Sequence, residues 1–98
     1  MQIIPLSVSE AQEFLSKHER HYKAPVEPIC AVGVGEVESE GKYATIHGAA
    51  ILGRADKGAG RTAELAHIYV DGTSQGYSLL YGGCWRALKA LGYEQTVL

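Results

Sequence analysis

The sequence predicts a mixed α+β domain, α/β three-layer-like, with a mostly antiparallel sheet and the order β-α-β-β-β-α-β. At 98 residues the chain is too short for two hydrophobic cores. Its 46% hydrophobic and 20% charged residues are typical of a globular protein. Strand-like apolar runs alternate along it with two helix-like amphipathic patterns. We therefore expect residues 1–98 to form a single domain with one compact core.

The first elements are a short strand and a helix. "QIIPLS" reads as a strand that its proline limits to a sheet edge or to its own first residues. A helix is predicted from about residue 8 to 20. Either Ser7 with Glu10 or Ser9 with Gln12 can form its capping box, and the sequence leaves both open.

The middle of the chain predicts a hairpin. "ICAVGVGEVE" and "YATIHGAAILGR" are β-branched and apolar, and the polar turn "ESEGK" lies between them, as in adjacent antiparallel strands. Gly48 interrupts the second run, which indicates a bulge or a close backbone approach.

A strand, loop, helix and strand complete the pattern. "AELAHIYV" predicts the fourth strand, and a helix is expected from about Tyr77 to Leu91, with Gly92 as its stop. "YEQTVL" predicts the last strand. Because such crossovers join parallel strands, we expect it to lie beside the fourth.

Charge and composition exclude several function classes. The net charge is −2 and no block of like charges occurs, which disfavours binding to nucleic acid or to an anionic membrane. The start has no basic n-region and no segment reaches transmembrane length, so a cytoplasmic protein is expected. Cys30 and Cys84 lack zinc-site spacing and read as small buried hydrophobes. His18 and His21 are three apart, but no third ligand has suitable spacing, so no metal site is predicted.

The loop "DGTSQGYS" has the residue types of a phosphate cradle. The first amides of a helix have no carbonyl partners and carry partial positive charge, so a pyrophosphate can bind there without a basic side chain. Gly76 would allow close approach, Ser78 could supply a hydroxyl, and Thr73, Ser74 and Gln75 offer further short donors. An ordinary strand-to-helix turn uses the same residue types, and that interpretation stays open. Neither a P-loop nor a G-x-G-x-x-G pattern is present, so a nucleoside triphosphatase or a dinucleotide dehydrogenase is not supported.

"TSQGYS" resembles the Q/R-x-x-G-x-G/A loop of the GNAT N-acetyltransferase superfamily, with Thr73 where that family prefers Arg or Gln. The chain is also similar to a small GNAT-like branch of bacteria and phages through "HERHYKAP", "GAAILGR", "AELAH" and "DGTSQGYSLLYGGCWRALKALGY". His67 stands where that branch usually has Arg. Relatives continue beyond the fifth strand with a further helix and strands, so the resemblance implies a domain truncated after that strand.

The resemblance implies an N-acyltransferase that uses acetyl-CoA to modify an amine of a small molecule or protein. The coenzyme would bind between the fourth and fifth strands, and the first helix would end near the acceptor. The implied residues are Ile68, Val70, Thr73, Gln75, Gly76, Tyr77 and Ser78 for the coenzyme, His18, His21 and Tyr22 for the substrate, and Glu64 and His67 for catalysis.

Glu64 and His67 are the candidate bases that take the ammonium proton. The period-2 rule places them on opposite faces of the fourth strand unless a bulge intervenes. It also puts Glu64 on one face with Ala66, Ile68 and Val70. A buried, paired carboxylate and a hydrogen-bonded structural histidine are the alternative interpretations, and both stay open.

Two other functions stay open as alternatives. One is a catalytically inactive GNAT-fold binding or inhibitor module, of a kind that a phage could encode. The other is modification of a nucleic-acid base, which the net acidity disfavours. Tyr77, Tyr81 and Trp85 recur at helical spacing and predict either packing or a partner surface. A homodimer is expected, joined over this stripe or across the last strand's edge.

Overall fold

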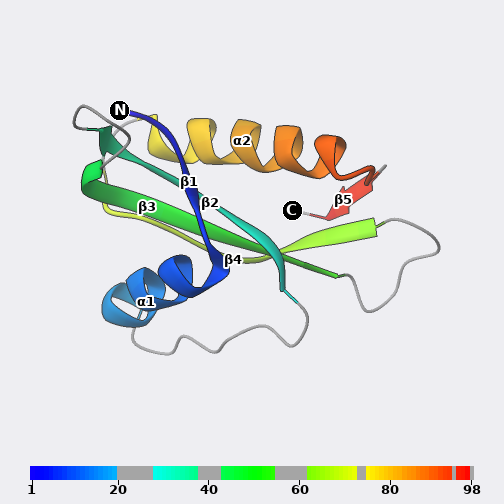
Figure 1. The fold of residues 1–98 in the computed structure, drawn as a ribbon, viewed down its shortest axis with the longest axis horizontal. Helices are drawn as coiled ribbons and strands as arrows, with labels where there is room; N and C mark the ends of the chain where they lie inside the picture. The colour runs from blue at the N-terminus through cyan, green and yellow to red at the C-terminus, as the bar shows by residue number, and fades with distance from the viewer. Residues whose placement is uncertain (20–27, 38–42, 55–61, 73–74, 94, 98) are drawn as a thin grey trace.

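A five-stranded sheet carries one helix on each face in the computed structural model, which describes residues 1–19, 28–37, 43–54, 62–72, 75–93 and 95–97 (Figure 1). Helix α2 crosses one side of the sheet and α1 the other. The elements are β1 (Gln2–Leu6), α1 (Val8–His18), β2 (Pro28–Val37), β3 (Tyr43–Arg54), β4 (Thr62–Val70), α2 (Gly76–Ala90) and β5 (Gln95–Val97).

The strands lie in the order β1-β2-β3-β4-β5. The first three pairings are antiparallel, and β4 pairs with β5 in parallel. The mixed α+β fold with a mostly antiparallel sheet is therefore confirmed, as are the β2–β3 hairpin and the position of the last strand beside the fourth. Strand β1 with Pro5 lies at a sheet edge, as the proline predicts.

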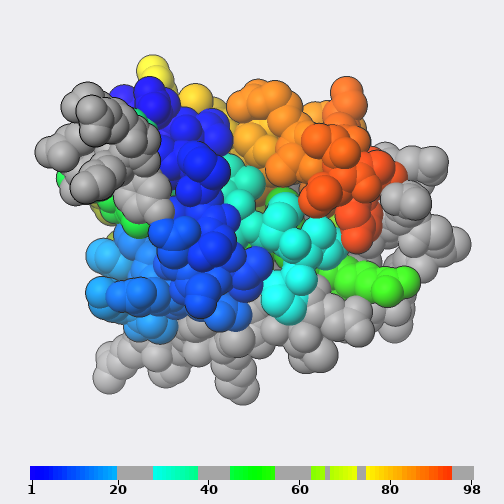
Figure 2. Space-filling model, viewed as in Figure 1, coloured from blue at the N-terminus to red at the C-terminus, as the bar shows by residue number. Residues whose placement is uncertain are grey.

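Each helix buries its apolar side against its own face of the sheet. Figure 2 shows residues of β1 and β2 reaching the surface between the two helices on this side of the molecule. The buried cluster under α1 consists of Ile4, Leu6, Ala11, Phe14, Leu15, Ala49 and Ile51. The buried cluster under α2 consists of Val32, Val34, Ala50, Leu52, Ala63, Val70, Leu80, Cys84 and Leu88.

Helix α1 begins with the first of the two predicted capping boxes. Ser7 Oγ accepts a hydrogen bond from the amide of Glu10 at 3.1 Å, and Glu10 Oε1 accepts one from the amide of Ser7 at 2.9 Å. These bonds satisfy two amides that the first turn leaves without carbonyl partners. The helix ends at His18, about two residues earlier than predicted, because Glu19 is already extended at φ −113° and ψ 117°.

Replacing Ser7 with alanine is expected to lower the free energy of unfolding by about 1 kcal/mol, because the amide of Glu10 loses its acceptor. Ser9→Ala is the matched control, since Ser9 lies inside the helix and Ser7 provides the cap. Urea denaturation of both variants measures the difference. Equal losses in the two variants would contradict the assigned cap.

Helix α2 ends in a Schellman motif. Gly92 has φ 88°, a left-handed conformation that favours glycine. The amide of Tyr93 donates to the carbonyl of Leu88 at 2.9 Å, and the amide of Gly92 donates to that of Lys89 at 3.0 Å. Gly92 is therefore the helix stop, as predicted.

The sequence predicts a bulge or a close backbone approach at Gly48, and the structure has the close approach at Gly48 and a bulge at the preceding residue. The β2–β3 register passes from Val34↔Gly48 to Gly35↔Ile46, so His47 is the extra residue of a bulge. A Cβ at Gly48 would lie 2.8 Å from the carbonyl oxygen of Tyr69. The bulge and the close approach thus occur at neighbouring residues.

Within the part of the chain that the structure describes, neither α1 nor α2 has the length and apolar character needed to cross a bilayer. The cytoplasmic compartment stays a prediction.

Candidate functional site

A bulge in β4 determines which way the candidate bases face. The register between β3 and β4 passes from Ile51↔His67 to Leu52↔Leu65, so Ala66 is the extra residue. Cross-strand partners share a face of the sheet. Ile51 belongs to the α1 cluster and Leu52 to the α2 cluster, so His67 faces α1 and Leu65 faces α2.

The same bulge puts Glu64 on the α1 face of the sheet, which also carries His67. Glu64 pairs with Gly53 and precedes the α2-facing Leu65, so it belongs to the opposite face. The prediction that Glu64 shares a face with Ile68 and Val70 is wrong, since both of these residues pack with the α2 cluster. The period-2 rule failed here because Ala66 shifts the alternation by one residue.

His67 is held by Glu19, a residue that the sequence did not single out. His67 Nδ1 lies 2.7 Å from Glu19 Oε2, and the two side chains are 24% and 23% exposed. Glu19 is the C-cap residue of α1, and its amide donates to the carbonyl of Leu15 at 2.7 Å. The end of α1 and the bulge of β4 are therefore joined by a largely buried ion pair or hydrogen bond.

An aromatic cluster continues this face. The ring of His18 stacks on that of Tyr69 with centroids 5.3 Å apart, and Phe14 contacts His18 at 4.3 Å. Tyr69 lies two residues beyond His67 on β4 and packs with the α1 cluster. Of the predicted substrate residues, His18 therefore lies on the face that carries His67, whereas His21 and Tyr22 are outside the described residues.

The predicted coenzyme loop leads into the N-terminus of α2. Gln75 is the N-cap residue, in the left-handed conformation at φ 72°, and its side chain makes no capping hydrogen bond. The first turn contains no acidic residue. Among the described residues, the first bond of the helix is the one that the amide of Leu79 donates to the carbonyl of Gln75 at 3.0 Å, so the amides of Gly76, Tyr77 and Ser78 belong to its first turn. The partial positive charge of a helix start favours an anion at this position.

The other predicted coenzyme residues have different environments. Val70 is buried beneath α2 and Ile68 is half-buried on the same face, so mainly their backbone is available to a ligand. Tyr77 is 48% exposed and stacks on Tyr81 with centroids 6.5 Å apart. Thr73 is outside the described residues.

Gly76 is explained by packing. It is buried, and a Cβ at this position would overlap Cγ1 of Val70. The glycine therefore lets α2 approach β4 closely. The position that a Cβ would occupy points towards the sheet, so a phosphate is not needed to explain why this residue is a glycine.

Asp71 lies at the start of the loop, where a carboxylate would repel a phosphate, but this carboxylate contacts His47. Its Oδ2 lies 2.6 Å from His47 Nδ1, and its amide donates to the carbonyl of His47 at 2.9 Å. His47 Nε2 also lies 3.6 Å from Glu36 Oε1. His47, the bulge residue of β3, thus holds the carboxylate of Asp71 against the central strand.

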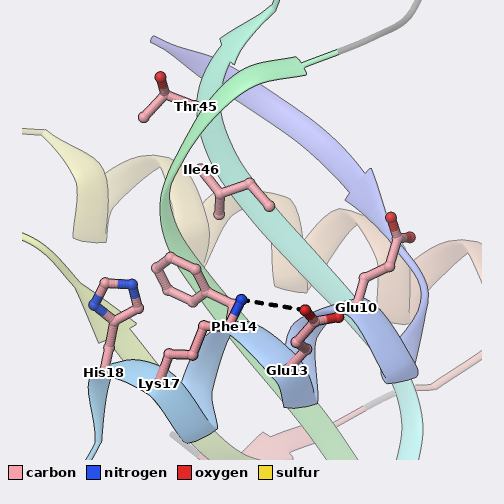
Figure 3. Close-up of a pocket in the computed structure, with 7 residues that line it drawn as sticks. All are labelled: Glu10, Glu13, Phe14, Lys17, His18, Thr45 and Ile46. Carbon is pink, nitrogen blue, oxygen red and sulfur yellow. Dashed lines mark hydrogen bonds and ion pairs between the residues drawn. The ribbon is translucent and has the colours of Figure 1, made fainter.

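A shallow pocket of about 400 Å³ lies between α1 and the beginning of β3 (Figure 3). Lys17 Nζ contacts Glu13 Oε1 at 3.2 Å, and Glu10 Oε1 accepts a hydrogen bond from the amide of Ser7, so all three charged side chains already have partners at α1. The lining residues are Glu10, Glu13, Phe14, Lys17, His18, Thr45 and Ile46.

The cysteines and the metal-ligand types add no further candidate. Both cysteines are free thiols; Cys84 is buried, as predicted, whereas Cys30 is only half-buried and packs against the α2 cluster. Burial raises the pKa of the Cys84 thiol to about 11, so this thiol is neutral at physiological pH. Among the described residues, no group of three or more His, Cys, Asp or Glu side chains is arranged so that it could hold a metal ion.

Comparison of the chain with models of protein families, with curated proteins and with solved structures gives no match.

Proposed function

We propose that the chain is a GNAT-like N-acyltransferase that binds acetyl-CoA and transfers the acetyl group to an amine. The observation that carries this proposal is the β4–α2–β5 crossover, in which α2 begins just beyond the carboxyl end of β4. Open sheets with parallel strands bind ligands at the carboxyl ends of those strands, and helix N-termini there bind phosphates. The α2 N-terminus has the features that such a ligand needs.

The local charges support a pyrophosphate at this position. The amides of Gly76, Tyr77 and Ser78 lie in the first turn of α2, and among the described residues this turn has no carboxylate that would compete with an anion. The nearby Asp71 is paired with His47. A helix N-terminus supplies a field equivalent to about half a positive charge, which explains how a chain with net charge −2 could bind this anion.

The α1 face supplies candidate groups for the chemistry. Transfer requires a base for the ammonium proton and close positioning of the amine beside the thioester. The β4 bulge puts both Glu64 and His67 on the face where His18 and Tyr69 stack. The acceptor amine is therefore proposed to lie on the α1 side of β4.

Isothermal titration calorimetry with acetyl-CoA tests the binding step. We expect a saturable heat, and at least tenfold weaker binding of S-acetylpantetheine, which has the thioester and lacks the pyrophosphate. Gly82→Ala is a suitable control for helical glycines, because the atoms nearest to a Cβ there belong to the flexible Arg86 guanidinium, the first of them at 3.3 Å. No heat at millimolar acetyl-CoA would refute the proposal. Binding without acetyl transfer to a panel of amines would favour the inactive binding module.

A further inference from the structure

We infer that Glu19 is a positioning residue that orients His67 to act as the general base through its Nε2 atom. The catalytic part of this inference rests on the proposed acyltransferase function. The orientation of the imidazole by Glu19 does not, because it follows from the geometry alone. The two parts can therefore be tested separately.

The contact itself specifies one form of the ring. A carboxylate only accepts hydrogen bonds, so the Nδ1 atom that lies 2.7 Å from Glu19 Oε2 carries a proton. In the neutral imidazole the lone pair is then on Nε2. Glu19 thus holds the neutral ring in the form in which Nε2 is the atom that can accept a proton.

Both partners are fixed by local structure. Glu19 is held by the bond from its amide to the carbonyl of Leu15 and is extended as the C-cap of α1. His67 reaches the α1 face through the bulge at Ala66. With side chains 23% and 24% exposed, the pair is shielded more than an ordinary surface contact. Glu13 and Lys17 of the same helix form such a surface contact, with side chains 70% and 67% exposed.

The proposed reaction transfers the acetyl group from the coenzyme sulfur to the amine nitrogen. Nε2 of His67 accepts one proton from the substrate ammonium, and the amine nitrogen forms a bond to the carbonyl carbon of acetyl-CoA. The bond between that carbon and sulfur breaks. The departing thiolate takes the second proton of the amine nitrogen, which yields the amide and free coenzyme A, and His67 later loses its proton to solvent.

The first test reads the form of the ring by nitrogen-15 NMR in uniformly labelled protein. In the wild type, neutral His67 is expected to carry its proton on Nδ1. Glu19→Ala should shift it towards the Nε2-protonated form that free histidine favours. Glu19→Gln should keep the wild-type form, because an amide oxygen also accepts the bond. Glu13→Gln is the matched control and should leave the His67 signals unchanged.

The second test is kinetic. General-base catalysis contributes roughly 10²–10⁴-fold, so His67→Gln should lower kcat by about 10²-fold or more and remove the acidic limb of the pH–rate profile. Glu19→Ala should lower kcat at least tenfold with an unchanged KM for acetyl-CoA. Glu13→Gln should retain wild-type kcat. Thermal unfolding of each variant identifies losses that come from misfolding, and Glu19→Leu replaces the alanine variant if that variant does not fold, because a leucine side chain cannot accept the bond from His67.

The outcomes separate the inference from the function. An unchanged His67 tautomer in Glu19→Ala would overturn the positioning role, whatever the activity. Wild-type kcat in Glu19→Ala or His67→Gln, together with acetyl-CoA binding, would overturn the catalytic part and leave the acyltransferase proposal standing. A large loss in Glu64→Gln alone would assign the base to Glu64.

Discussion

Replacing Leu80 with alanine is expected to lower the free energy of unfolding by about 2–5 kcal/mol. Leu80 lies one turn into α2, is 0% exposed and packs in the cluster under that helix. Truncation removes apolar contacts and leaves a cavity between helix and sheet. The loss is a large share of the roughly 5–15 kcal/mol that stabilise a typical domain. Urea denaturation followed by circular dichroism measures it.

The same substitution at an exposed site provides the control. Leu91 is 50% exposed at the end of α2, so Leu91→Ala should change the free energy of unfolding by no more than about 0.5 kcal/mol. Leu15→Ala, on the other face and also 0% exposed, should cost as much as Leu80→Ala. A small effect of Leu80→Ala with a large effect of Leu15→Ala would mean that α2 does not pack on the sheet as described.

Local sequence rules predict the elements of this fold well, because their physical causes are local. The capping box at Ser7 and the left-handed Gly92 each depend on residues within one or two turns. The position of β5 beside β4 follows from the handedness of crossover connections. What the sequence left open at the helix start was only a choice between two serines of similar capping potential.

The candidate site depends on contacts that no local pattern contains. The bulge at Ala66 arises from how β4 aligns with β3, and it reverses the face that alternation assigns to Glu64. The partner of His67 is Glu19, which comes to it from the end of α1. A sequence search for a base could find His67 from its residue type. It had no signal for the carboxylate beside it, because that contact exists only once α1 is packed on the sheet.

Gly76→Ala is expected to destabilise the protein by about 1–3 kcal/mol and to weaken binding of acetyl-CoA. The added Cβ would overlap Cγ1 of Val70, so α2 must move away from β4. That movement displaces the amides at the helix start, which the proposed pyrophosphate needs. Urea denaturation and calorimetry measure the two effects.

The double variant Val70→Ala/Gly76→Ala tests the cause of both effects. Val70→Ala removes the γ-methyl groups that the new Cβ would meet, so the two substitutions should be coupled by about 0.5–3 kcal/mol in the stabilising direction. Gly82→Ala provides the reference for a helical glycine without this contact, and it should be neutral or slightly stabilising. If the two losses simply add in the double variant, contact with Val70 is not the reason why residue 76 is a glycine.

Acetyl-CoA binding by the double variant distinguishes the two roles of Gly76. The Cβ position of residue 76 points towards Val70 and the sheet, while an anion would bind at the amides of the first turn. Once Val70→Ala provides space, the helix start can return to its place, and binding should recover to the level of Val70→Ala alone. If stability recovers and binding does not, the phosphate itself requires a glycine at this position. Recovery would instead show that the cradle is made by the amides of the α2 N-terminus and that the glycine serves the packing that places them.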